Sequence, residues 1–86
     1  MPKSIPKKRE IPERYTKEAK KVVSVAMARA GIKYPELCER LENLGITYSE
    51  QSLRNKISKG LFPADFLMAV LDACGERLGS LLPEQQ

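Results

Sequence analysis

The chain has 86 residues, of which 42% are hydrophobic and 30% are charged, with a net charge of +4 and no histidine. This length suits one small domain, and no apolar run reaches the roughly 18 residues that a transmembrane helix needs. The composition lacks the commonest general base, and no glycine-rich phosphate loop is present. We therefore expect a binding protein and not an enzyme, with no catalytic residues, no cofactor, no small-molecule substrate and no membrane contact.

The two cysteines, Cys38 and Cys74, have neither a second cysteine nor a histidine near them. A structural zinc site needs about four such ligands at close spacing, so we expect no metal. Both cysteines lie among apolar residues on predicted helices, which indicates small buried side chains in a reducing compartment. No apolar stretch follows the basic N-terminus as it does in a secretory signal. We expect a cytoplasmic protein.

Basic residues are concentrated at the N-terminus. Residues 1–21 contain eight basic and three acidic side chains, whereas the remainder has a net charge of −1. Prolines at positions 2, 6 and 12 oppose helix formation, so residues 1–15 are predicted to form a flexible basic arm. A domain at 16–76 and a short leucine-containing tail at 77–86 follow. The arm favours a polyanionic partner, although a purely solubilising tail has the same composition.

Apolar residues at helical spacing predict four helices and no strand. Thr16 offers a cap for a helix at 17–30, and Pro35 fits the first turn of a helix at 35–44. Thr47 and Glu50 have the spacing of a capping box before a helix at 49–59, and Pro63 opens a helix at 63–74. The predicted fold class is all-α, a bundle of four helices with a fifth if the tail adds a last turn. The expected buried stripe of the first helix is Val22, Val23, Ala26, Met27 and Ala30, and that of the second is Leu37, Cys38, Leu41 and Leu44.

The helix at 49–59 differs from its neighbours, because its only large apolar residues are Leu53 and Ile57, one turn apart. It would therefore dock by a narrow stripe and present most of its circumference outward. Its other side chains are those that bond base edges or phosphates, and Glu50 is its only acid. The remaining polar residues are Gln51, Ser52, Arg54, Asn55, Lys56, Ser58 and Lys59.

Residues 28–74 follow the order helix, helix, glycine turn, Ser/Gln-rich helix, Gly-x-x-Pro, apolar helix. This order resembles the phage-repressor and Cro-like helix-turn-helix family, and Gly60 and Pro63 match its Gly-x-x-Pro segment. Residues 48–60 also resemble a family of small bacterial domains of unknown function, and this likeness spans about 16–75. Compared with repressors, the second helix is nearly a turn longer and the two anchors are four residues apart instead of three. The resemblance therefore implies a helix-turn-helix with an enlarged turn.

The resemblance implies a bacterial DNA-binding transcriptional regulator that reads the major groove of double-stranded DNA with the helix at 49–59. Carried over by position, the base-contacting residues are Ser49, Gln51, Ser52 and Asn55. The expected phosphate contacts are Arg54, Lys56 and Lys59, with Lys7, Lys8 and Arg9 from the arm.

Two alternatives stay open. One is a protein-interaction module, an antitoxin or adaptor, that docks through the helix at 63–74 and the leucine-rich tail; the other is RNA binding. A homodimer is also expected, with the outer edge of the helix at 63–74 and Leu78, Leu81 and Leu82 supplying the contact.

Overall fold

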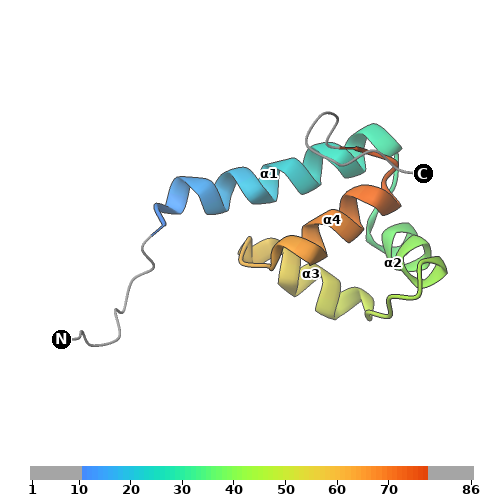
Figure 1. Ribbon diagram of the computed structural model, residues 1–86. Coiled ribbons are helices and arrows are strands. Elements are labelled where there is room, and N and C mark those ends of the chain that lie inside the picture. Colours follow the sequence, from blue (N-terminus) through green and yellow to red (C-terminus); the bar gives the residue numbers. More distant parts are fainter. Residues whose placement is uncertain (1–10, 78–86) are drawn as a thin grey trace.

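The computed structural model describes residues 11–77 and contains four helices there, with no strand. They are α1 (Glu13–Ala30), α2 (Tyr34–Asn43), α3 (Glu50–Lys59) and α4 (Ala64–Ala73). Both α1 and α2 pack against α3 and α4, and the N-terminal turns of α1 project past the other helices (Figure 1). The all-α fold class is confirmed. The predicted extra turn of the tail lies outside the described residues.

The core takes residues from every helix. Five large side chains are fully buried, and they are Val23, Leu37, Leu41, Leu53 and Val70. The apolar face of α4 belongs to this core as well, since Phe66, Val70, Leu71 and Ala73 are all buried within the chain. Most of the apolar face that the sequence suggested as a docking surface therefore packs inside the molecule, whereas the outer edge of α4, the expected dimer contact, carries exposed residues such as Asp65 and Asp72. Leu78, Leu81 and Leu82 lie outside the described residues.

Of the expected core residues, Ala30 and Cys38 are half-buried and two others are exposed. Val22 is 44% exposed and Leu44 is 47% exposed. Val22 sits one position before the buried Val23, and consecutive residues on a helix point about 100° apart, so only one of the two can face the core. Leu44 is the C-cap of α2, where the chain leaves the helix.

The helix ends agree with the sequence to within four residues. The largest difference is at α1, which begins at Glu13 with Pro12 as N-cap, so that Thr16 lies inside the helix and does not cap it. Residues 13–15 are therefore helical, and the predicted flexible arm is wrong for them. Proline at position 12 has a φ of −58°, which suits the residue that leads into a helix. Residues 11 and 12 precede the helix, and residues 1–10 of the predicted arm lie outside the described part of the chain.

The start of α2 also differs in detail. Lys33 is the N-cap, and its backbone N–H donates to the Glu36 carboxylate at 2.9 Å. Pro35 consequently occupies the second helical position, one later than expected. At its other end α2 is tied to α4, because Arg40 donates from Nη1 to the backbone carbonyl of Ala73 at 3.1 Å. That bond holds the two helices in register where both end.

Candidate functional site

The third helix, α3, is held by two buried anchors. Leu53 is fully buried and Ile57 is 3% exposed, which confirms the predicted inward stripe. At the end of α3, Gly60 has a φ of +68° and lies against α1 so closely that a Cβ there would sit 2.8 Å from the Thr16 carbonyl oxygen. The C-terminal end of α3 thus lies against the α1 backbone, and the face of α3 opposite its anchors is exposed to solvent.

The N-terminus of α3 is capped by Ser49, whose Oγ accepts a hydrogen bond from the Ser52 backbone N–H at 3.0 Å. The predicted capping box between Thr47 and Glu50 is wrong. Thr47 lies two residues ahead of the cap, and Glu50 is the first helical residue. Ser49 was expected to contact bases; its hydroxyl oxygen is used by the helix, although the residue is exposed.

The exposed face of α3 carries amide, hydroxyl and ammonium groups. Gln51, Ser52, Asn55 and Lys59 are all exposed, so the structure brings three predicted base contacts and one predicted phosphate contact onto one surface. Gln51 donates from Nε2 to the Asn55 side-chain oxygen at 3.3 Å, which links two amides one turn apart. This bond leaves both amides with further donors and acceptors.

A hollow of about 490 Å³ borders this face. Four α3 side chains line it together with Tyr48 and Leu61, which precede and follow the helix. Leu61 is 52% exposed, and Tyr48 packs edge-on against Phe66 with the ring centroids 5.6 Å apart. The α3 residues in the hollow are Ser52, Asn55, Lys56 and Lys59.

The cationic side chains of α3 lie on both flanks of the exposed face. On one flank, Arg54 bonds Glu50 through Nη2 at 2.6 Å and stacks over the Tyr34 ring at 4.6 Å. On the other flank, the Lys56 ammonium lies 5.4 Å from the Phe66 ring centroid. Lys56 is half-buried by this contact, while Lys59 on the same flank is exposed. Of the predicted phosphate contacts on α3, Arg54 and Lys59 are thus exposed and Lys56 is half-buried.

The sequence did not identify Tyr34, Tyr48 or Leu61 as neighbours of the site. Tyr34 stacks on a residue 20 positions later, and no local pattern reports such a contact. Tyr48 was noted only as part of the segment before the helix. The predicted arm contacts Lys7, Lys8 and Arg9 lie outside the described residues, so the structure does not place them near α3.

Neither cysteine forms a disulfide. Desolvation raises the pKa of the Cys38 thiol, with the Glu50 and Glu42 carboxylates acting in the same direction. Burial likewise raises the pKa of Cys74, and the nearby Arg40 guanidinium opposes this only in part. Both thiols are therefore poor nucleophiles near neutral pH. Residues 11–77 contain no group of three or more potential metal ligands, and none of the helices there is long and apolar enough to cross a membrane.

Comparison with known proteins identifies the family of this chain. A family model described as a domain of unknown function (DUF6471) matches residues 15–77, which contain all four helices except the first two residues of α1. No match was found among curated proteins or among solved structures. Because the family model spans most of the sequence, the chain belongs to the DUF6471 family.

Proposed function

We propose that this protein is a DNA-binding transcriptional regulator and that α3 enters the major groove of double-stranded DNA. One observation carries the proposal: α3 is anchored by two residues and turns a row of exposed amide, hydroxyl and ammonium groups to solvent. A major groove roughly 12 Å wide accepts one helix presented in this way. In this proposal, α2 and α3 act as a helix-turn-helix of the repressor kind, with residues 44–49 as the enlarged turn.

The order of side chains around α3 suits a groove with a phosphate strand on each side. With about 100° per residue, Gln51, Asn55 and Lys59 lie opposite the buried anchors, Arg54 lies on one flank and Lys56 lies on the other. Amides at the centre can bond an adenine edge bidentately, and cations on the flanks can bond the two phosphate strands. The acid nearest this face, Glu50, is paired with Arg54 and so repels phosphate less.

Binding to a duplex of random sequence tests this proposal. We expect binding by fluorescence anisotropy at about 50 mM salt, with log affinity falling linearly as log salt rises. The Lys59→Ala variant should bind every duplex more weakly by a similar factor, with a slope shallower by about 1. No binding at low salt would show that α3 does not contact the phosphates, and an unchanged slope in Lys59→Ala would show that Lys59 does not contact them.

The N-terminal basic residues belong to the same proposal. We expect Lys7, Lys8 and Arg9 to contact DNA phosphates beside those bound by α3. Each phosphate contact contributes about −0.9 to the slope of log affinity against log salt. Replacing all three by alanine in the full chain should therefore flatten the slope by up to about 2.7, while the preferred sequence stays the same. If the slope is unchanged, these residues do not touch the DNA.

A further inference from the structure

The outer side of α1 carries an apolar stripe that the core does not cover. Of the six large hydrophobic residues that are exposed in the described part of the chain, three lie on α1: Tyr15, Val22 and Val25, at 47%, 44% and 48% exposure. Glu18 and Arg29 continue their row. Positions 15, 18, 22, 25 and 29 alternate steps of three and four residues, which is the spacing of a helix that packs along a second helix.

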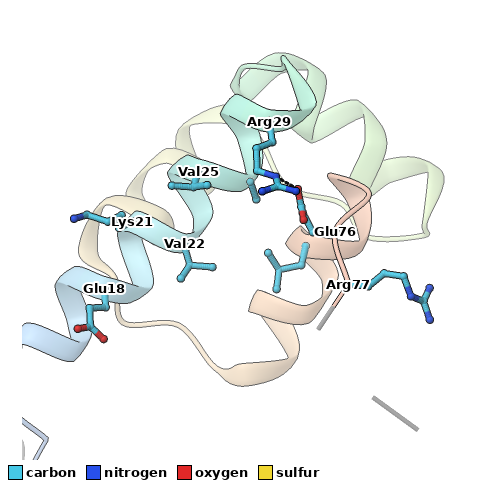
Figure 2. Close-up of a pocket in the computed structure, with 9 residues that line it drawn as sticks. Glu18, Lys21, Val22, Val25, Arg29, Glu76 and Arg77 are labelled. Carbon is cyan, nitrogen blue, oxygen red and sulfur yellow. Dashed lines mark hydrogen bonds and ion pairs between the residues drawn. The ribbon is translucent and has the colours of Figure 1, made fainter. Parts of the chain in front are cut away.

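This stripe borders a groove of about 460 Å³. Figure 2 shows Glu18, Val22, Val25 and Arg29 along α1, with the Arg29 side chain reaching Glu76 just after α4. Leu71 and Ala26 are the buried residues that line it. Arg29 donates from Nε to Glu76 at 2.8 Å, yet its side chain remains 69% exposed. The guanidinium thus has N–H groups left for a second carboxylate.

We propose that α1 pairs antiparallel with α1 of a second copy of this chain, across a two-fold axis between residues 23 and 24. Positions equidistant from that axis then face each other. Val22 meets the partner's Val25, and Glu18 meets the partner's Arg29, so the apolar pair lies at the centre and an ion pair closes each end. A stripe whose charges are complementary to themselves under a two-fold rotation fits a second copy of the chain.

The dimer leaves α3 accessible in both copies. Ser24 and Ala28 lie on the opposite flank of α1, where they line a surface hollow together with Glu50 and Arg54 of α3. The stripe therefore faces away from the N-terminal half of α3. The inference does not rest on DNA binding, and its test contains no DNA, so each proposal can fail without the other.

Sedimentation equilibrium of the full chain tests the pairing. We expect a monomer–dimer equilibrium at micromolar concentration. Val22→Asp with Val25→Asp should raise the dimer Kd at least about 100-fold, because it places four carboxylates in the apolar centre without partners. The fold should survive, as judged by circular dichroism, since both valines are exposed. Ser24→Asp, which adds one carboxylate per chain on the other flank, is the control and should dimerise like the parent.

A charge swap tests the register. Glu18→Lys sets lysine against the partner's Arg29, and Arg29→Glu sets two glutamates together, so each variant alone should dimerise about tenfold more weakly. Mixing the two variants restores an opposite-charge pair at both ends, and the mixture should form a heterodimer as tight as the parent. If the mixture stays monomeric, the register is wrong.

Two outcomes overturn the proposal as a whole. One is a parent protein that stays monomeric at several hundred micromolar, which is the result expected if the chain's own residues 78–86 fill the groove. The other is a dimer that persists in Val22→Asp with Val25→Asp but is lost in Leu81→Asp with Leu82→Asp, because the tail would then make the contact.

Discussion

Gly60 shows how one residue sets the distance between α3 and α1. Its φ of +68° lies in the left-handed region, and the space that a Cβ would occupy is taken by Thr16 and the Lys20 side chain. Gly31, the C-cap of α1, has nearly the same φ of +71° but faces open space. The two glycines therefore separate the cost of the backbone conformation from the cost of the close approach.

Replacing each glycine by alanine should give different losses of stability. Gly31→Ala meets only the left-handed penalty, about 1–2 kcal/mol. Gly60→Ala meets that penalty and also forces α3 away from the α1 backbone, so we expect about 2–4 kcal/mol in total. Urea denaturation of both variants measures the difference. Equal losses would mean that α3 and α1 are not held this closely.

The thiol of Cys74 should make stability depend on pH at the alkaline end. Burial raises its pKa above the ordinary 9.0, so the folded chain keeps the proton that the unfolded chain releases. The contribution is fully present below about pH 9 and declines as pH rises further, because the unfolded state gains by ionising. Cys74→Ala should show a shallower fall in unfolding free energy between about pH 8 and pH 10. An identical fall in both proteins would contradict a buried thiol.

At the scale of the helix, α3 depends on a cap and on two anchors. The cap was assigned to Thr47 from the sequence, whereas the Ser49 hydroxyl accepts the Ser52 N–H. Ser49→Ala should therefore cost about 1 kcal/mol of stability, and Thr47→Ala should cost almost nothing. Thermal unfolding of the two variants shows which residue caps α3. A larger loss of stability in Thr47→Ala than in Ser49→Ala would support the capping box.

The Ile57 anchor should matter much more than its exposed neighbours. Ile57 is only 3% exposed. Its truncation to alanine should lower the free energy of unfolding by about 2–5 kcal/mol through lost packing. Lys59→Ala, two residues later and exposed, should stay within about 0.5 kcal/mol of the parent. Chemical denaturation measures both. If the two variants lose similar stability, α3 is not anchored as described.

Helical periodicity was enough to predict the four helices and the anchors of α3. Leu53 and Ile57 stand alone in a polar segment, so their inward orientation followed from spacing, and the glycines that follow the helices fixed the C-terminal ends to within one residue. Periodicity could not show which of Val22 and Val23 faces the core, because the two adjacent residues have the same side chain. Only the packed structure shows that Val23 faces the core and that Val22 joins an exposed stripe.

The candidate site was predicted in part. The exposed row of Gln51, Ser52, Asn55 and Lys59 follows directly from the two anchors, since those positions must point away from them. The contacts of Arg54 and Lys56 could not be predicted from the sequence. Their stacking on Tyr34 and Phe66 joins residues 20 and 10 positions apart, and tertiary packing alone brings them together.

At the scale of the whole molecule, its two proposed binding surfaces lie on different sides. The α3 face carries amides and cations, whereas the α1 stripe carries valines between an acid and a base. A two-fold dimer through α1 would present two copies of α3 to one duplex. Half-sites should then be arranged as an inverted repeat, about one helical turn apart or a multiple of it.

Selection of bound sequences from a pool of randomised duplexes tests most directly whether α3 reads DNA. The parent protein should enrich a defined motif. The control variant Asn43→Ala, which deletes an exposed amide at the end of α2, should enrich the same motif. Gln51→Ala and Asn55→Ala should each lose preference at one or two base pairs, because a bidentate amide–adenine pair contributes roughly 1–3 kcal/mol of discrimination. If the parent enriches no motif, or if both α3 variants enrich the parental motif unchanged, α3 is not the element that reads DNA.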